Sequence, residues 1–485
     1  MTRRERPAPI RFGTDGWRAV IADEFTFENV ERVAQAYAEF LRRPGGAAQT
    51  TDEGTARPRP HVVVGHDRRF LSESFAARAA EVLAGNDVAV SLFETDVPTP
   101  LVSWAVRERG AAGGVVITAS HNPAHFNGFK IKAPWGGSAT AETTVAVESL
   151  VDAAPPRLGE LGPESRGRLE AEAESYRAQV ASYVDLGRLK ALRSRVVVDP
   201  MHGTGGLWVE SFLRGGPLDV ETIRGERDAL FGGVSPEPID RNLGPLRARV
   251  AERRALVGLA TDGDADRVGA VNERGETMTM HEVVPVVLLH LARGRGMAGG
   301  VVRTFSQSVL LKRIAAAHNL KLYETPIGFK YIADLMLRED ILIGAEESGG
   351  IGVRGHLPER DGILNSLLLL EAIAASGRTP TELVREMHRE FGEFHFGRRD
   401  LHTEVARGLA LVESLAARPP AAVGPHPVES VETLDGTKLV FGDESWLLLR
   451  QSGTEPVLRV YAETTSAAKT HALLDEGCRL ADAFR

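Results

Sequence analysis

Short apolar runs alternate with segments of helical periodicity along most of the chain. In the first third, apolar runs at residues 61–67, 88–94 and 113–120 are separated by amphipathic segments at 72–85 and 101–111. Apolar runs of about four to eight residues that end in polar turns predict buried strands. A regular alternation of such strands with helices predicts an α/β fold with a largely parallel sheet.

The same alternation starts again twice, at residues 194–206 and at 281–294, and the last ninety or so residues show a helix, strand, strand, helix pattern. We therefore expect an α/β protein with three similar domains built on mixed or parallel sheets, and a smaller C-terminal α+β domain, around a central cleft. The expected domains are residues 1–160, 161–272, 273–388 and 389–485.

Three segments interrupt this alternation. Residues 152–167, which are rich in proline and glycine, and residues 390–403 are predicted to be linkers. Residues 42–60 have the composition of a long insertion between a helix and a strand.

Composition narrows the classes of function. The 485 residues exceed what one hydrophobic core holds, and 43% hydrophobic with 26% charged residues is typical of a globular protein. A net charge of -8 argues against nucleic acid as the main partner. The single cysteine, Cys478, excludes an intrachain disulfide, and the apolar runs are too short to span a bilayer. We expect a cytoplasmic protein without a membrane partner.

Three aspartates alternate in one turn after an apolar strand. Asp262, Asp264 and Asp266 repel one another unless a cation compensates them, and carboxylate oxygens are the ligands that Mg²⁺ prefers. An EF-hand is disfavoured because its sixth position would be Arg267 instead of glycine. A solvated acidic turn without a metal is the alternative.

A serine lies at the mouth of the strand predicted at 113–117. Ser120 is followed by His121, and Lys130 and Lys132 come shortly after. If this turn and the aspartates share a site, the serine oxygen could carry a phosphoryl group, with His121 as acid or base and the lysines neutralising phosphate oxygens. A helix N-cap at Ser120 is the structural alternative.

Two further turns suit an anionic sugar. At 450–459 a guanidinium, hydroxyls and a tight turn combine in Arg450, Ser452, Gly453 and Thr454, which suits a phosphate cradle, although taken alone a turn of this composition is explained better by a plain loop. Arg459 either faces the cradle or lies on a solvated strand edge. Glu346 and Ser348 lie on one side of an extended segment and could bind vicinal sugar hydroxyls, although a plain polar loop explains them equally well.

Isolated cations elsewhere are less specific. Arg18 follows a glycine-rich turn, and Lys330 lies between apolar residues, where a lysine usually meets an anion or extends to solvent. Arg354, His356 and Arg360 could equally form a charged surface. Since ligands bind at the carboxyl ends of parallel strands, we expect the four strand-end turns to meet in one cleft.

The motifs TASHNP (118–123), DGDADR (262–267), GAEES (344–348) and RQSGTEP (450–456), in this order, resemble those of the α-D-phosphohexomutase superfamily, the phosphoglucomutase/phosphomannomutase group. The resemblance covers essentially the whole chain. It implies a phosphorylated serine at Ser120, Mg²⁺ bound by Asp262, Asp264, Asp266 and the Ser120 phosphoryl oxygen, and sugar hydroxyls held by Glu346 and Ser348. The distal phosphate would lie on Arg450, Ser452, Gly453 and Thr454. Charge and proton transfer would come from Arg18, His121, Lys130, Arg267 and Lys330.

The implied reaction is an isomerisation of hexose phosphates through a hexose 1,6-bisphosphate, in a monomer or homodimer. Ala265 departs from the glycine of many members, which we expect to be tolerated if its φ is negative. The Glu346-Glu347-Ser348 form is similar to the glucose-phosphate branches, so phosphoglucomutase is favoured over phosphomannomutase and phosphoglucosamine mutase. A Mg²⁺-dependent sugar phosphatase and a non-catalytic sugar-phosphate-binding protein are the remaining alternatives.

Overall fold

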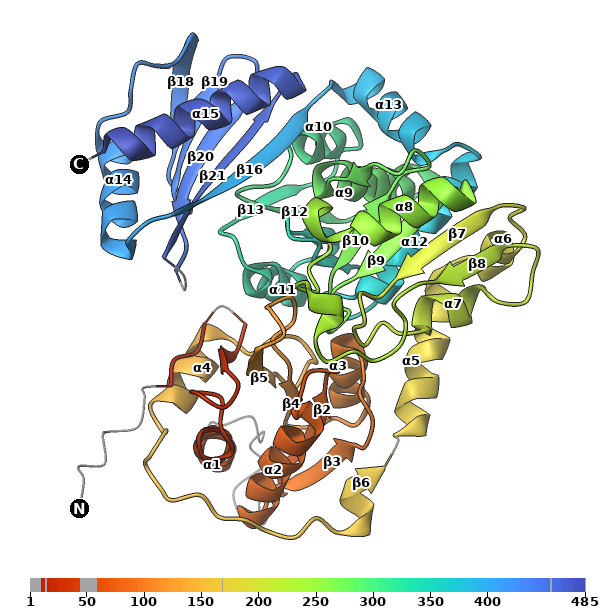
Figure 1. Cartoon of the computed structure of the whole chain (residues 1–485), viewed down its shortest axis with the longest axis vertical. Helices are drawn as coiled ribbons and strands as arrows, with labels where there is room; N and C mark the ends of the chain where they lie inside the picture. Colours follow the sequence, from red (N-terminus) through yellow and green to blue (C-terminus); the bar gives the residue numbers. More distant parts are fainter. Residues whose placement is uncertain (1–9, 14, 44–58, 168, 454–455, 485) are drawn as a thin grey trace. The chain divides into compact units, whose positions relative to one another are not determined.

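The computed structural model describes residues 10–13, 15–43, 59–167, 169–453 and 456–484. These form two compact units, and Figure 1 labels many of their helices and strands. Unit 1 comprises the chain as far as Thr277 together with Gly350–Ala374, and unit 2 comprises Met278–Gly349 and the chain from Ala375 onward.

The first domain of unit 1 is a six-stranded mixed sheet with the strand order β1-β5-β4-β2-β3-β6. Strand β2 is parallel to β3 and β4, whereas β5 runs antiparallel to both β4 and β1. On one face of this sheet, Val62 and Val64 of β2 pack in a hydrophobic core with Ala34 and Ala76. The strands and helices are β1 (Trp17–Val20), α1 (Phe27–Arg42), β2 (His61–His66), α2 (Ser72–Gly85), β3 (Ala89–Phe93), α3 (Thr99–Glu108), β4 (Gly113–Ile117), β5 (Phe126–Lys132), α4 (Ala141–Glu148) and β6 (Arg166–Gly167).

The second domain of unit 1 has a sheet with the strand order β11-β10-β9-β7-β8. Strands β8, β7 and β9 are parallel, and β10 returns antiparallel to β9 through the aspartate turn. Its elements are α5 (Glu170–Tyr183), α6 (Leu186–Lys190), β7 (Arg195–Asp199), α7 (Trp208–Leu213), β8 (Asp219–Thr222), α8 (Gly244–Arg253), β9 (Val257–Thr261), β10 (Val268–Val271) and β11 (Thr277–Met278). Strand β15 (Ile351–Val353) and most of helix α12 (Gly362–Ser376) also belong to unit 1.

Unit 2 begins with parallel strands in the order β13-β12-β14. Its helices and strands are α9 (Met280–Leu289), β12 (Gly300–Thr304), α10 (Val309–Ala317), β13 (Leu322–Thr325), α11 (Phe329–Arg338), β14 (Ile341–Ala345) and α13 (Pro380–Phe391). A capping box of Thr279 with Glu282 begins α9, because each residue satisfies a backbone or side-chain group of the other.

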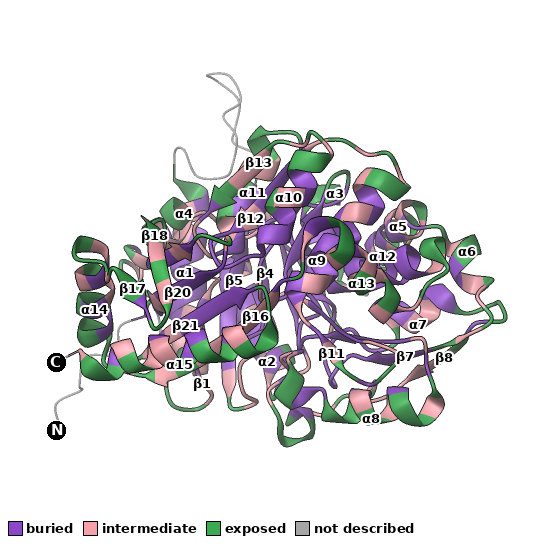
Figure 2. Cartoon of the chain, turned by 90° about the horizontal axis from the view of Figure 1, so that it is seen from above, coloured by how far each residue is buried: buried purple, intermediate pink, exposed green. Residues whose placement is uncertain are grey.

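The C-terminal domain, also in unit 2, is a sheet with the order β16-β21-β20-β19-β18-β17, in which neighbouring strands run antiparallel. Residues Leu447, Leu449, Val460 and Ala462 of its central strands pack with Leu473 in one core. Its elements are β16 (His395–His402), α14 (Val405–Ala417), β17 (Ala422–Val423), β18 (His426–Glu432), β19 (Thr437–Phe441), β20 (Trp446–Gln451), β21 (Val457–Thr464) and α15 (Ala467–Ala483). Figure 2 shows α14 and α15 with exposed outer surfaces, while β4 and β5 of unit 1 are buried.

The predicted fold class is confirmed: α/β domains with mixed sheets precede a C-terminal domain with its own sheet. The linker predicted at 390–403 is wrong, because residues 395–402 form β16 and pair along their whole length with β21. The predicted insertion at 42–60 falls largely on residues 44–58, which lie outside the described residues. Within the described part of the chain, none of the helices has the length and apolar character needed to cross a bilayer.

Candidate active site

Ser120 lies in the turn that joins β4 to its antiparallel neighbour β5. The serine has a left-handed backbone with φ of 52°, and its N–H donates to Thr118 Oγ1 at 2.8 Å. Because a strand and not a helix follows this turn, the alternative of a helix N-cap is wrong. The serine is nearly inaccessible, with 1% of its surface exposed.

A single buried guanidinium shapes this turn. Arg69 donates to the backbone carbonyls of Ser120 (2.6 Å), Asn122 (2.7 Å), Pro123 (2.8 Å) and Phe126 (3.0 Å). Its Nε donates to Asp67 at 3.0 Å, so the charge is balanced inside the protein. The role of Arg69 could not be predicted from the sequence, since a residue that binds backbone carbonyls leaves no pattern of partner residues to detect.

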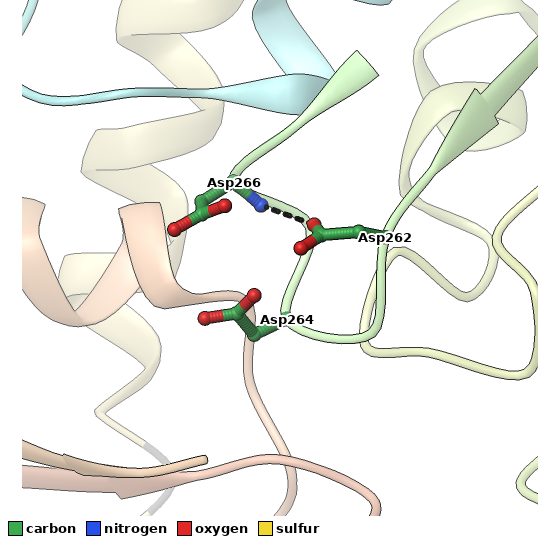
Figure 3. Close-up of side chains that lie close together, drawn as sticks. All are labelled: Asp262, Asp264 and Asp266. Atoms are coloured by element: carbon green, nitrogen blue, oxygen red, sulfur yellow. Dashed lines mark hydrogen bonds between the residues drawn. The ribbon is translucent and has the colours of Figure 1, made fainter. Parts of the chain in front are cut away.

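The three aspartates lie in the turn between β9 and β10 (Figure 3). Each has 0% of its surface exposed, which rules out a solvated acidic turn. Asp262 Oδ1 accepts the N–H groups of Asp266 (3.0 Å) and Arg267 (3.1 Å), so the backbone of the turn fixes this carboxylate. The two predicted motifs meet here, because Ser120 Oγ donates to Asp262 Oδ2 at 2.7 Å.

Two residues between the aspartates have special backbone requirements. A Cβ on Gly263 would lie 2.5 Å from the Ser120 carbonyl oxygen, so only glycine allows the two turns to approach this closely. The condition under which Ala265 was expected to be tolerated, a negative φ, is not met: its φ is 60°, and the residue is completely buried. Its N–H donates to the Asp262 carbonyl and its own carbonyl accepts from Gly362, contacts that hold alanine in the left-handed region.

The turn offers oxygen atoms suited to a divalent cation. One oxygen from each of Asp262, Asp264 and Asp266 lies within 4.8 Å of the others. Among the described residues, the Oδ1 atoms of Asp264 and Asp266 are buried without a hydrogen-bond partner. A buried carboxylate oxygen without a donor is costly, and hard oxygen donors suit Mg²⁺, so these residues fit the metal.

Electrostatics supports the same interpretation. Burial, followed by the charges of Asp264 and Asp266, raises the pKa of Asp262 well above its usual range. Burial would also raise the pKa of Asp264, but Lys130 and Thr99 outweigh it and lower that pKa. The turn therefore concentrates negative charge that a bound cation would relieve.

Several predicted cations surround the serine and the aspartates in unit 1. Lys130 Nζ lies 2.9 Å from Asp264 Oδ2 and 3.3 Å from Asp266 Oδ2. Arg18 donates to Asn122 Oδ1 at 2.7 Å, and Arg267 Nε lies 3.9 Å from Asp266 Oδ1. Burial and then the charges of Arg267 and Arg18 lower the pKa of His121 well below its usual range, so its ring is neutral at pH 7. His121 Nδ1 lies 3.4 Å from Ser120 Oγ.

Other charged residues near this turn differ from their predicted roles. Lys132 Nζ donates to Glu359 Oε2 at 2.7 Å, so its ammonium is already paired with a carboxylate of the protein. Arg360, for which a charged surface was the alternative, has 4% of its surface exposed and lies 3.0 Å from Asp266. His356 is also buried, stacked on Trp104. Asp15, which no sequence motif indicated, has its carboxylate 2.9 Å from Lys130 Nζ and 2.7 Å from Arg360 Nη2.

The predicted sugar-binding turn lies in unit 2, directly after β14. Glu346 is buried, with 6% of its surface exposed, and Ser348 is half-buried. Between them, Glu347 lies 3.5 Å from Arg398 of β16. The ion pair therefore joins this turn to the first strand of the C-terminal sheet.

The predicted phosphate-binding turn also lies in unit 2, between β20 and β21. Arg450 and Arg459 are directly opposite each other in the two strands, so their side chains share one face of the sheet. Ser452 is buried and Gly453 exposed, whereas Thr454 lies outside the described residues. Asp435 Oδ2 lies 2.9 Å from Arg450 Nε and accepts from the N–H of Ile327, three residues before the half-buried Lys330.

A buried serine that lies beside a turn of three carboxylates, both at strand ends of α/β domains, is an arrangement suited to the transfer of a phosphoryl group. Four segments match family domains described as "Phosphoglucomutase/phosphomannomutase": α/β/α domain I (residues 9–157), domain II (174–275), domain III (281–391) and the C-terminal domain (404–479). The chain belongs to the phosphoglucomutase/phosphomannomutase family, whose members are isomerases. The resemblance of the motifs is thus confirmed.

Individual relatives match over nearly their whole length. A phosphoglucomutase/phosphomannomutase of Thermococcus kodakarensis is 31% identical over 97% of this chain and 98% of its own. A phosphoglucosamine mutase of Frankia casuarinae is 31% identical over 95% of this chain and 96% of its own. A crystal structure of a Thermus thermophilus protein, provisionally named a phosphomannomutase, has a TM-score of 0.85 and 37% identity, with 99% and 100% of the two chains covered.

Proposed function

We propose that this phosphohexomutase interconverts glucose 1-phosphate and glucose 6-phosphate through a phosphoserine at Ser120 and a glucose 1,6-bisphosphate. The observation that carries the proposal is the 2.7 Å hydrogen bond from Ser120 Oγ to Asp262 in a buried pair of turns. A serine used only for packing would not require a left-handed backbone clamped by Arg69.

The residues of unit 1 suit transfer of a phosphoryl group. The bond between phosphorus and Ser120 Oγ breaks as a sugar hydroxyl forms a new bond to phosphorus, and the neutral His121 accepts the hydroxyl proton. Lys130, Arg18 and Arg267 provide positive charge around the transferred group. The carboxylates of Asp262, Asp264 and Asp266, with a Ser120 oxygen, would hold Mg²⁺. When bound, the metal would offset charge on the phosphoryl oxygens.

The residues of unit 2 suit the rest of the substrate. Glu346 and Ser348 would accept and donate hydrogen bonds to sugar hydroxyls, and Arg450, Ser452, Gly453, Thr454 and Arg459 would bind the phosphate that is not transferred. Lys330 would add positive charge. In the second half of the cycle, Ser120 Oγ takes a phosphoryl group back from the other position of the bisphosphate, so no phosphate is consumed.

Replacing the serine tests the central role. Ser120→Ala should lower conversion of glucose 1-phosphate to glucose 6-phosphate by about a thousandfold or more, because the group that carries the phosphoryl is lost. The control is Ser149→Ala, an exposed serine of the same domain, which should keep full activity. Full turnover in Ser120→Ala would contradict the proposal. Release of inorganic phosphate without isomerisation by the wild type would favour the phosphatase alternative.

Glucose is proposed as the sugar because Glu347 separates Glu346 from Ser348, as in the glucose-phosphate branches. The relatives include phosphoglucosamine mutases, so the choice of sugar needs its own test. The values of kcat/KM for glucose, mannose and glucosamine 1-phosphates, measured side by side, should be highest for glucose. A strong preference for mannose or glucosamine would contradict the assignment while leaving the role of Ser120 intact.

A further inference from the structure

Two aspartates of the turn between β9 and β10 each pair one carboxylate oxygen with donors of the protein, whereas the other oxygen accepts no hydrogen bond from the described residues. Asp264 Oδ2 accepts from Thr99 Oγ1 at 2.7 Å and from Lys130 Nζ at 2.9 Å. Asp266 Oδ2 lies 3.0 Å from Arg360 Nη2 and 3.3 Å from Lys130 Nζ. In both residues the Oδ1 atom lacks a hydrogen-bond partner among the described residues. The donors on one oxygen thus fix the direction of the other.

The two cations are themselves held by a carboxylate that is remote in sequence. Asp15 Oδ2 lies 2.7 Å from Arg360 Nη2 and 2.9 Å from Lys130 Nζ. Burial would raise the pKa of Asp15, but Lys130 and Arg360 outweigh it and hold that pKa well below its usual range. One anion therefore fixes two cations, and the cations fix two predicted metal ligands.

The Nε side of the Arg360 guanidinium also contacts a carboxylate. Its Nε lies 3.3 Å from Glu359 Oε1, and the other oxygen of Glu359 accepts from Lys132 (2.7 Å) and Ser138 (2.8 Å). Arg360 therefore contacts Asp15 and Asp266 from a segment in which the adjacent side chain, that of Glu359, is itself held by hydrogen bonds. A planar guanidinium that contacts several carboxylates restrains their orientation better than a mobile ammonium does.

We propose that Arg360 and Asp15 are positioning residues, which turn the Oδ1 atoms of Asp266 and Asp264 toward a divalent cation. The inference rests on the proposed function of this turn as a metal site. In proteins, partners that orient metal ligands through hydrogen bonds commonly change metal affinity by about 10- to 100-fold when they are replaced.

The sign of the effect separates positioning from simple charge. Arg360 is a positive group next to the metal turn, so removing it should strengthen cation binding if only its charge matters. If Arg360 orients Asp266, its removal should weaken binding, because the carboxylate is then free to rotate. The two explanations predict opposite shifts in the same measurement.

The experiment is a titration of the full-length protein with Mn²⁺, in which free Mn²⁺ is measured by electron paramagnetic resonance. Arg360→Gln and Asp15→Asn should each raise the Kd for Mn²⁺ by about tenfold or more. Arg360→Lys keeps the positive charge but loses the planar guanidinium, and its Kd for Mn²⁺ should lie between those of the wild type and Arg360→Gln. The control is Arg354→Gln, which removes the same charge from an exposed position of the same segment and should leave the Kd unchanged.

Activity supplies a second readout. In Arg360→Gln, kcat at low Mg²⁺ should fall while KM for the hexose phosphate stays close to wild type, and excess Mg²⁺ should restore kcat. A purely structural defect would not be rescued by metal. Thermal melts check folding, and if Arg360→Gln does not fold, Arg360→Lys decides the question, because it keeps the charge and charge alone therefore predicts an unchanged Kd.

An unchanged or lower Kd in Arg360→Gln, with Mn²⁺ bound by the wild type and lost in Asp264→Asn, overturns the positioning role and leaves the proposed function in place. Absence of Mn²⁺ binding by the wild type overturns the metal site and the positioning role together, whereas the Ser120→Ala assay still tests the phosphoserine independently.

Discussion

At the scale of single residues, the contact between the serine turn and the aspartate turn depends on one missing methyl group. A Cβ at Gly263 would lie 2.5 Å from the Ser120 carbonyl oxygen and 3.0 Å from Pro236 Cγ. We expect Gly263→Ala to push the turns apart and to lower mutase activity by about 100-fold, since a displacement of about 1 Å at a reacting group can cost that much. Steady-state kinetics with glucose 1-phosphate measures the loss.

Gly244→Ala is the matched control, because a Cβ there meets nothing within 4 Å. It should leave kcat/KM at the wild-type value. Wild-type kinetics in Gly263→Ala would show that the 2.7 Å contact between Ser120 and Asp262 is not needed for turnover.

The residues proposed to bear the chemistry could be singled out from the sequence because serine, aspartate and cation motifs are local in the chain. Ser120, Lys130 and the aspartates were found in this way, and the structure brings them together in unit 1. Arg360 and Asp15 could not be assigned, because their roles depend on partners more than 100 positions away or in another segment. The positive φ of Ala265 was also out of reach, since tertiary hydrogen bonds impose it.

At the scale of elements, the turn between β4 and β5 depends on a side chain from another segment. Arg69, which follows β2, donates to four backbone carbonyls of this turn. We expect Arg69→Met to destabilise the protein by about 3–5 kcal/mol, because it leaves Asp67 buried without its cation and the carbonyls without their donor. Chemical denaturation measures the free energy of unfolding.

Arg78→Met is the control for this prediction. Arg78 pairs with Glu31 and Glu81 at the surface of α2, where such pairs contribute about 1 kcal/mol or less. Equal destabilisation by the two variants would contradict the role of Arg69 as the clamp of the turn.

Strands could be predicted from the sequence where the local pattern of apolar residues is strong. The apolar runs at β2, β4 and β9 were found because their faces are buried and their residues are almost uniformly apolar. Strand β16 was missed because its residues His395–His402 are mostly polar or charged and only partly buried. Its strand conformation comes from pairing with β21, which the local sequence does not encode.

At the scale of the whole molecule, the division into three α/β domains and a C-terminal domain could be predicted, because repeated alternation is visible along the chain. The meeting of all four turns in one cleft stays a prediction, since it depends on packing between domains and on no local pattern. Within unit 2, Glu463 is one of the residues that link the two domains directly. Glu463 of β21 lies 2.9 Å from His281 Nδ1 of α9 and accepts from the N–H of Val309, at the start of α10, and from Trp446 Nε1.

This link predicts a dependence of stability on pH. Burial would raise the pKa of Glu463, but His281 and the other donors outweigh it and lower that pKa to about 2, from an ordinary value of 4.5. A lowered pKa in the folded state contributes stability that is complete above pH 4.5 and is lost as the pH falls toward 2. The shift corresponds to about 3 kcal/mol.

We therefore expect the wild type to exceed Glu463→Gln in free energy of unfolding at pH 7, and the difference to shrink by about 3 kcal/mol as the pH falls through this window. Urea denaturation at a series of pH values, followed by circular dichroism, measures it. Glu429→Gln, at an exposed position of β18, should track the wild type throughout. A constant difference between wild type and Glu463→Gln at every pH would show that the contact between the α9–α10 segment and the C-terminal sheet does not depend on the ionised carboxylate.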